Sequence, residues 1–403
     1  MNGSVNMQQI ANGALAGLKV IDLSRVLGGP FCAQILGDHG ADVIKVEPPQ
    51  GDETRGWGPP FQDGTASYYL GINRNKRGIV IDLTLPAGRD LLRRLLADAD
   101  VLVENFKTGT LEKWGLGYEQ TLSKLFPKLI HCRISGFGAD GPLGGLPGYD
   151  AVIQAMAGIM SVNGESGGDP LRVGLPVVDM VTGLNAVIGI LLALQERQRS
   201  GKGQFVEAAL YDSGVSLLHP HLANHFLSGK VSAPTGNAHP NIAPYDTYAT
   251  KTTPIYLAVG NDGQFAKLCE QLGQADLAAD SRFATNGARC NHRAELKTAL
   301  EALLADHECK PVAERLIRCG VPCGPVLGID EVVAHPHTAH REMLVSIGDY
   351  KGAGAPIKLS RTPASYRTAP PGFGAQTMEV LTELGLEKSE LDILLQEGVV
   401  KVV

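Results

Sequence analysis

The sequence is poor in aromatic side chains and carries no excess of positive charge. Phe, Trp and Tyr make up 5% of the 403 residues, and the formal net charge is −6 at pH 7. This balance gives the chain no overall attraction for nucleic acid or for an anionic membrane surface, so neither is expected as a partner. An anionic small molecule must therefore be met by a local group of basic residues.

Signatures of several familiar sites are also missing. The first glycine-rich turn, Gly28-Gly29-Pro30, is not a GxGxxG, and Ser135 is not framed as a GxSxG elbow, which argues against a plain dinucleotide oxidoreductase and a serine hydrolase. The segment HPHLANHF (residues 219–226) has no carboxylate at ligand spacing and no HExxH is present, so no metal site is expected. The seven cysteines are odd in number and scattered, which predicts reduced thiols in a cytoplasmic protein.

The ends and the apolar runs give no targeting signal. Residues 1–16 contain no Lys or Arg and no sustained apolar stretch, so they are interpreted as a flexible lead-in. The longest apolar run follows Asp179, but it carries Asn185 and ends in Gln195-Glu196-Arg197. No membrane-spanning segment is therefore expected.

Apolar runs alternate with helical patterns through the first half of the chain. Strands are expected at 19–23, 41–47, 78–83, 101–104 and 129–135, with helices such as 31–37 and 87–97 between them. This rhythm is typical of an α/β fold with a doubly wound, Rossmann-like parallel sheet. We expect a large domain at 17–225, with helices at 150–160 and 211–228, then a turn-rich linker at 226–240, a smaller α/β domain at 241–330, and a return segment at 331–403 with a late strand around Ile357 and Leu359.

Asp179 stands alone at a change of pattern within Leu171–Glu196. The residues before it are apolar and interrupted by proline, whereas those after it recur at helical spacing around almost the whole axis, which predicts a buried helix beginning at this acid. Taken alone, the stretch favours Asp179 as the N-cap of that helix. A nucleophilic carboxylate, held still and partly desolvated, remains compatible with the same position.

A second cluster is basic. Arg74, Lys76 and Arg77 fall within four residues at the entrance of a predicted strand, and Asn105 follows another strand. Each cation alone reads as part of a solvated turn, but three together in an acidic protein are also consistent with phosphate binding. We expect them near the carboxyl ends of the strands, where such sheets bind ligands.

With these residues in view, the chain resembles the class III CoA-transferases, the CaiB/BaiF type, from about Leu15 to its end. The motifs that carry the resemblance are GLKVIDLSRVLGGPFCAQILGDHGADVIKVEPPQGDETR, NRNKRGIVIDL, VLVENFKTGTLEKWGLGYE, PGYDAVIQAMAGIMSVNG, VVDMVTGLNAVIGILLAL, GKGQFVEAALYD and VPCGPV. The resemblance implies that Asp179 is the nucleophile. It also implies coenzyme A contacts, to which we add Arg77 from the basic cluster; the set is Leu27, Gly28, Arg77, Ile81, Asp82, Leu83, Thr84, Asn105, Phe106, Lys107, Lys113, Gly148, Tyr149 and Asp150.

The resemblance further implies a Rossmann-like large domain with the smaller domain inserted, and an interlocked-ring homodimer. Leu27 and Pro48 replace residues of the formyl-CoA transferases, so the chain looks closer to enzymes that move coenzyme A from succinyl-CoA to a dicarboxylate such as glutarate, hydroxymethylglutarate, itaconate or malate. Acyl-CoA would be a substrate, with no tightly bound cofactor. The alternatives are an α-methylacyl-CoA racemase, in which Tyr149 would stand at the catalytic histidine, and a non-catalytic CoA-binding protein. Arg25, Arg133 and Arg172 are candidates for binding a distal carboxylate.

Overall fold

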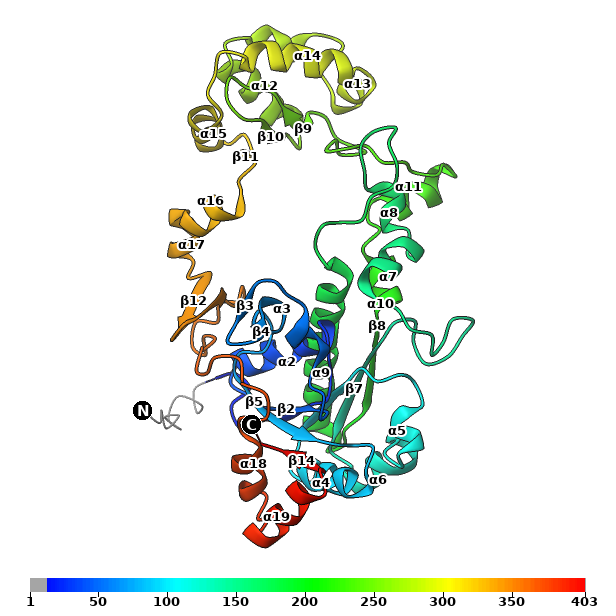
Figure 1. Cartoon of the computed structure of the whole chain (residues 1–403). Helices are drawn as coiled ribbons and strands as arrows, with labels where there is room; N and C mark the ends of the chain where they lie inside the picture. Colours follow the sequence, from blue (N-terminus) through cyan, green and yellow to red (C-terminus); the bar gives the residue numbers. More distant parts are fainter. Residues whose placement is uncertain (1–12, 403) are drawn as a thin grey trace. The chain divides into compact units, whose positions relative to one another are not determined.

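A computed structural model describes residues 13–402, which form two compact units (Figure 1). The large unit contains the chain up to Ile159, Val173–His219 and the chain from His337 onward, whereas the small unit contains Met160–Arg172 and Pro220–Pro336. The small unit thus includes the domain expected at 241–330, the linker expected at 226–240 and a segment from before residue 173. Of the expected lead-in 1–16, only residues 13–16 are described, and there the N–H of Leu15 donates to the carbonyl of His39 at 2.9 Å.

The large unit is built on a seven-stranded sheet in the order β14-β5-β2-β1-β6-β7-β8. Its strands are β1 (Lys19–Asp22), β2 (Asp42–Glu47), β5 (Lys76–Ile81), β6 (Val101–Glu104), β7 (Ile130–Ser135), β8 (Phe205–Ala209) and β14 (Val400–Lys401). Neighbours are parallel except β14, which pairs antiparallel with β5. The chain adds β2 and β5 on one side of β1 and β6, β7 and β8 on the other. The α/β architecture is confirmed, and β1 and β6 frame a topological switch point.

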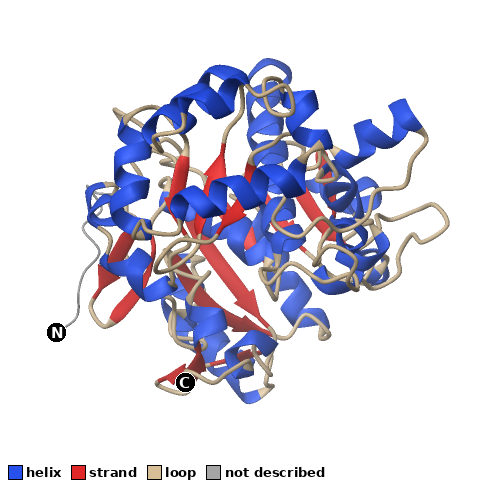
Figure 2. Cartoon of the chain, turned by 90° about the horizontal axis from the view of Figure 1, so that it is seen from above, coloured by secondary structure: helices blue, strands red, loops and turns tan. Residues whose placement is uncertain are grey.

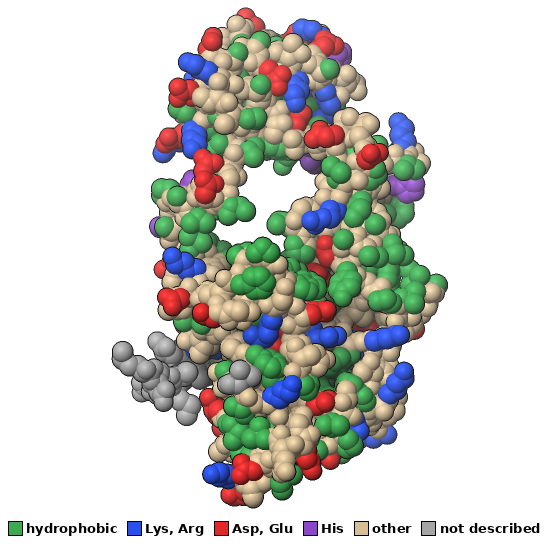
Figure 3. Space-filling view, in the orientation of Figure 1, with side chains coloured by type: hydrophobic (Ala, Val, Ile, Leu, Met, Phe, Trp, Pro, Cys, Tyr) green, Lys and Arg blue, Asp and Glu red, His purple; other side chains and the backbone are tan. Residues whose placement is uncertain are grey.

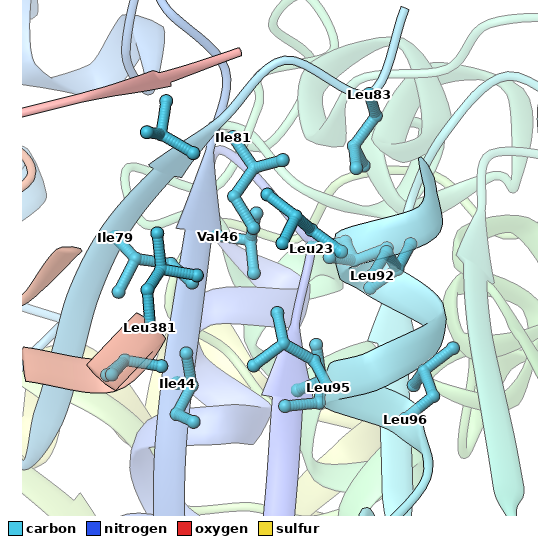
Figure 4. Close-up of a cluster of buried hydrophobic side chains, with 14 of the residues drawn as sticks. Leu23, Ile44, Val46, Ile79, Ile81, Leu83, Leu92, Leu95, Leu96 and Leu381 are labelled. Carbon is cyan, nitrogen blue, oxygen red and sulfur yellow. The ribbon is translucent and has the colours of Figure 1, made fainter. Parts of the chain in front are cut away.

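Helices cover both faces of this sheet (Figure 2). Successive strand residues point to opposite faces, so Val20 and Ile21 of β1 join different hydrophobic clusters. The cluster with Ile21, drawn in Figure 4, is closed by α4 (Pro86–Leu96), α18 (Thr377–Glu383) and α19 (Lys388–Gln396). The cluster with Val20 is closed by α2 (Gly28–Asp38) and α9 (Val177–Ser200). Burial on both faces explains why the strands are visible in the sequence as nearly continuous apolar runs.

The long helix α9 is buried on one side only, so the prediction of a helix buried all round is wrong for the single chain. Its inner side packs against α2 and β8, and a Cβ on Gly183 would stand 2.7 Å from the carbonyl oxygen of Gly28. Its outer side leaves Leu184, Ile188, Leu191 and Leu192 exposed by 41%, 54%, 41% and 65%. By length and composition α9 would also meet the requirements of a membrane span, contrary to the expectation from its polar residues, and 44% of its most apolar window is buried within the protein.

Shorter elements connect the large unit and differ from the sequence predictions in places. They are η1 (Glu53–Gly56), β3 (Phe61–Gln62), β4 (Thr65–Ala66), α3 (Ser67–Leu70), α5 (Thr110–Lys113), η2 (Tyr118–Leu122), α6 (Ser123–Leu125), α7 (Asp150–Met156), α10 (Leu210–Ser216), α17 (Pro336–His340), β12 (Leu344–Ile347) and β13 (Tyr350–Ala353). One further helix, α8 (Ile159–Val162), begins at the last residue of the first segment of the large unit and continues into the small unit. The helix expected at 150–160 breaks at Gly158, where φ is +87°. The strand expected at Ile357 and Leu359 is wrong, because the β12–β13 hairpin forms just before it and residues 354–376 are irregular.

The small unit has a three-stranded antiparallel sheet, in the order β11-β10-β9, and a core of its own. Its elements are α11 (His221–Ser228), β9 (Tyr245–Tyr248), β10 (Ile255–Ala258), α12 (Asp262–Gln271), η3 (Ala275–Ala279), α13 (Asn286–Asn291), α14 (Arg293–Leu304), α15 (Cys309–Arg318), β11 (Cys323–Pro325) and α16 (Ile329–Ala334). The helix expected at 211–228 is in fact α10 and α11, separated at Pro220. On the face drawn in Figure 3, acidic and basic side chains are interspersed.

Candidate active site

The loops after β1 and β6 are tied together at the switch point. The backbone N–H of Arg25 donates to Asn105 Oδ1 at 2.9 Å, and Asn105 Nδ2 donates to the carbonyl of Arg25 at 2.7 Å. These two bonds fix the two loops where the chain direction across the sheet reverses. Ligands of doubly wound sheets bind in the crevice outside the carboxyl ends of the strands at this point.

Two cavities lie along this edge of the sheet. The first has a volume of about 290 Å³ and is lined by Arg25, Val26, Leu27, Gly28, Glu53, Asn105, Phe106, Lys107, Thr108, Ile134, Ser135, Gly136, Gly145, Leu146, Pro147, Gly148, Tyr149, Asp179 and Leu210. The second has a volume of about 370 Å³ and is lined by Leu23, Arg25, Val46, Glu47, Pro48, Pro49, Gln50, Ile81, Asp82, Leu83, Thr84, Phe106 and Trp114. Arg25 and Phe106 belong to both walls. The cavities therefore adjoin, and only the first contains Asp179.

Asp179 is the third residue of α9, and the prediction that it is the N-cap is wrong. The N-cap position is Pro176, which has no side-chain acceptor to offer. The cap comes instead from Asp150, whose Oδ1 accepts the N–H of Val178 at 2.8 Å and that of Asp179 at 3.2 Å. The carboxylate of Asp179 is therefore not used for capping, and it faces the first cavity.

Both carboxylate oxygens of Asp150 accept hydrogen bonds from within the protein. Its Oδ2 accepts Gln154 Nε2 at 2.6 Å, and Gln154 Oε1 in turn accepts the N–H of Val173 at 2.8 Å. Asp150 is buried and does not line either cavity, so its predicted contact with coenzyme A is not supported by its position. It instead orders the segment that leads into α9.

The surroundings of Asp179 disfavour its charge. The residue is 9% exposed, and within residues 13–402 its carboxylate receives no hydrogen bond and no ion pair. Burial, followed by the negative charge of Asp150, raises the pKa of Asp179 to about 7. A Cβ on Gly28 would lie 3.8 Å from Asp179 Oδ1, so the start of α2 approaches this carboxylate closely. A desolvated carboxylate without a cationic partner is a reactive group near neutral pH.

Tyr68 belongs to the surroundings of Asp179 and was missed by the sequence analysis. Burial, followed by the charges of Asp179, Asp150 and Asp52, raises the pKa of Tyr68 to about 12, which keeps its hydroxyl protonated as a hydrogen-bond donor. The ring of Trp57 meets that of Tyr68 edge-on at 5.2 Å. Tyr68 does not stand in a pattern that would have marked it, because it belongs to the short helix α3 within the irregular segment between β2 and β5.

Most residues predicted to contact coenzyme A are brought together here. Leu27, Gly28, Asn105, Phe106, Lys107, Gly148 and Tyr149 line the first cavity, and Ile81, Asp82, Leu83, Thr84 and again Phe106 line the second. Lys113 is exposed at the end of α5 and lines neither. Arg77 also lines neither, because its guanidinium is bonded to Asp42, Glu379 and Glu383.

The basic cluster is paired with carboxylates of the protein itself, so its position supports neither the solvated turn nor the phosphate site that the sequence left open. Arg74 pairs with Asp38 at 2.6 Å and Lys76 with Asp22 at 2.9 Å, and both pairs are buried. The cluster lies at the amino end of β5, not at the carboxyl end where ligands bind. The carboxylates that neutralise this cluster lie far from it in the sequence, so the sequence pattern around residues 74–77 did not reveal them.

A buried ion pair stands directly behind the wall of the first cavity. Lys45 Nζ donates to the carbonyl of Ser24 at 2.8 Å and to Asp52 Oδ2 at 3.1 Å, and Asp52 Oδ1 accepts the N–H of Thr54 at 3.0 Å. Ser24 precedes Arg25, and Asp52 precedes Glu53, so one lysine holds two cavity-lining loops. Buried charges of this kind fix geometry more than they add stability.

The glycine spacing GxGxxG does occur at Gly136–Gly141, after β7, but no helix begins there. It therefore lacks the strand–turn–helix context of a dinucleotide site. Among residues 13–402, no three His, Cys, Asp or Glu side chains gather as metal ligands would.

Comparison with known proteins agrees with this geometry. Residues 15–377 match the model of CoA-transferase family III. The chain is 43% identical to a succinate–glutarate CoA-transferase of Agrobacterium fabrum, over 92% of this chain and 95% of that protein, and 36% identical to a succinyl-CoA–D-citramalate CoA-transferase of Chloroflexus aurantiacus, over 95% and 97%. A crystal structure of a CaiB/BaiF family protein from Brucella suis superposes with a TM-score of 0.83 at 44% identity, covering 93% of this chain and 100% of that one.

Proposed function

The chain belongs to CoA-transferase family III, and on that basis we propose that it moves coenzyme A from succinyl-CoA to a dicarboxylate through an aspartyl-CoA thioester on Asp179. The observation that carries the proposal is the position of Asp179, a buried carboxylate without a partner that faces the first cavity. Family membership makes the protein a CoA-transferase enzyme. The acceptor belongs to the proposal, because the named relatives use glutarate or D-citramalate. Glutarate, hydroxymethylglutarate, itaconate and malate are the acceptors to test first.

The chemistry proceeds by acyl exchange at one side chain. The Asp179 carboxylate attacks the thioester carbonyl of the donor, which gives a mixed anhydride and releases the coenzyme A thiolate. The thiolate attacks the aspartyl carbonyl, forming the aspartyl-CoA thioester and freeing the donor acid as a carboxylate. The acceptor carboxylate then attacks this thioester, and the released thiolate attacks the acceptor's acyl carbon and restores Asp179. Every step exchanges acyl groups of similar activation, so no external energy source is required.

Stabilisation of the oxyanions must come from outside the first turn of α9. There the N–H of Val177 bonds to Leu175, those of Val178 and Asp179 bond to Asp150, and that of Met180 bonds to Pro176. By contrast, the N–H groups of Gly28 and Gly29 at the start of α2 make no hydrogen bond to any group within residues 13–402. We assign the oxyanion donors to this helix start, which also favours negative charge through its dipole.

The assignment of Asp179 is tested by trapping. Asp179→Ala is expected to lose transfer while still binding coenzyme A, and hydroxylamine added during turnover of the unmodified enzyme should convert one side chain to a hydroxamate that mass spectrometry locates at residue 179. Transfer at the normal rate by Asp179→Ala, or trapping at another residue, would overturn the assignment. A screen of dicarboxylates with succinyl-CoA, read by mass spectrometry, identifies the acceptor.

The exposed apolar side of α9 supports a homodimer, and the proposal keeps the interlocked ring implied by the resemblance. Leu184, Ile188, Leu191 and Leu192 form a stripe on one helix, which we call the outer stripe. An exposed stripe of this kind marks a protein interface in many enzymes. Acyl-CoA and a carboxylic acid are the proposed small-molecule partners, and the seven free cysteines support a reducing, cytoplasmic location.

A further inference from the structure

Arg25 occupies the place where the two cavities adjoin. It lines both of them, and its backbone is held on both sides by Asn105. The side chain is half-buried, and its guanidinium makes no hydrogen bond or ion pair with any group in residues 13–402. Other arginines of the large unit do the opposite: Arg55 is bonded to Glu47, and Arg133 is bonded to Glu104 and Glu112.

The second cavity is suited to a flat, largely apolar group. Its apolar wall residues are Leu23, Val46, Ile81, Leu83, Phe106 and Trp114, and the polar residues Glu47, Gln50, Asp82 and Thr84 line the same cavity and can meet the polar edge of a purine. Leu23, Val46, Ile81 and Leu83 belong to the cluster shown in Figure 4, so this wall is backed by the hydrophobic core. A purine ring stacks well on such surfaces. The first cavity, in contrast, contains the carboxylate on which the acyl group must react.

The covalent structure of coenzyme A determines where its pyrophosphate lies relative to the two cavities. A purine nucleotide with a 3′-phosphate forms one end, the thiol forms the other, and a pyrophosphate lies between the nucleotide and the pantetheine arm. With the thioester beside Asp179 and the purine in the second cavity, the pyrophosphate falls between the cavities. This inference therefore rests on the proposed function.

We propose that Arg25 binds the pyrophosphate of the acyl-CoA substrate. The guanidinium offers a planar pair of donors that matches two phosphate oxygens, and it has no competing carboxylate to release first. The paired bonds to Asn105 hold its backbone in place before the ligand arrives. Arg25 would then bind the coenzyme A moiety that all acyl-CoA substrates share. Other residues of the first cavity would distinguish one carboxylic acid from another.

The test removes the charge and the phosphate separately. For Arg25→Met, kcat/KM with succinyl-CoA is expected to fall about 10- to 100-fold, mainly through KM, as for other lost charge-assisted hydrogen bonds. With succinyl-3′-dephospho-CoA, kcat/KM of Arg25→Met should fall by the same factor. With succinyl-pantetheine, which lacks the pyrophosphate, kcat/KM of Arg25→Met should equal that of the unmodified enzyme. Arg25→Lys should retain part of the activity. Arg93→Met, which removes an arginine paired with Asp90 on the outside of α4, is the control and should leave all three substrates unchanged.

Two results would overturn the proposal. An equal loss with succinyl-pantetheine would assign Arg25 to the acyl end, such as the distal carboxylate of the acid. A loss that disappears with the 3′-dephospho substrate would assign it to the 3′-phosphate. Titration calorimetry without turnover tests the role of Arg25 separately from the proposed reaction at Asp179. Arg25→Met should weaken the binding of free coenzyme A and leave the binding of pantetheine unchanged, even in an Asp179→Ala background.

Discussion

The carboxylate of Asp150 caps the helix that carries Asp179, with its Oδ1 at 3.2 Å from the Asp179 backbone nitrogen. The same group therefore does two things to Asp179. It holds the backbone of the proposed nucleophile in place, and its negative charge contributes to the raised pKa of the nucleophile's side chain.

These two effects are separable by substitution. Asp150→Asn keeps an oxygen that can cap α9 but turns its amide NH2 toward Gln154 Nε2, whereas Asp150→Ala removes the cap, so both variants should lose about 1 kcal/mol of unfolding free energy. Removing the charge should move the acidic limb of the pH–rate profile to lower pH in both variants, and only Asp150→Ala should also lose kcat because Asp179 is less well held. Urea unfolding and pH profiles measure the two effects. Identical kcat in both variants would contradict a positioning role for the cap.

The unmodified enzyme should lose activity in mild acid. Asp179 must be ionised to attack, and its pKa is raised to about 7, so kcat/KM should rise about tenfold per pH unit below that value and level off above it. The profile is measured with succinyl-CoA over pH 5 to 9. A flat profile down to pH 5 would show that the reacting carboxylate ionises at its ordinary value.

Asp179 should cost the protein stability above neutral pH. Its pKa is about 7 when folded against 3.8 for an ordinary Asp, so between these values the folded state keeps a proton that the unfolded state has released. Stability from this group therefore falls as pH rises from 3.8 to 7, by at most roughly 4 kcal/mol. Asp179→Asn should unfold at a higher temperature than the unmodified protein at pH 8, and the difference should vanish near pH 4. The exposed Asp392→Asn is the control and should show no such trend.

The outer stripe of α9 should hold two chains together. Leu192 is 65% exposed in the single chain, and Leu192→Glu would place a charge in the proposed interface. Light scattering after size-exclusion chromatography should give a dimer for the unmodified protein and a monomer for this variant. Gln396→Glu adds the same charge to an exposed position at the end of α19, away from the outer stripe, and should remain dimeric. A dimeric Leu192→Glu protein would move the interface elsewhere.

The sequence predicts what depends on neighbouring residues and misses what depends on distant ones. The strands around Val20 and Val101 were predictable because burial on both faces leaves continuous apolar runs. The cap on Asp179 was not, because Asp150 reaches it from another helix. Likewise, the charge pattern around Arg77 gave no sign of the carboxylates that occupy it, and the apolar residues of α9 did not reveal which of them, such as Leu192, this chain leaves uncovered.

The antiparallel pairing of β14 with β5 joins Val400 to Ile81. During synthesis on the ribosome, β5 emerges long before its outer neighbour, so the growing chain carries an open strand edge for most of its translation. Unpaired edges of this kind attract other chains. Nascent molecules of this protein should therefore depend on chaperones until β14 has been made, and ribosome-bound fragments that stop before β14 should aggregate more readily than fragments that include it.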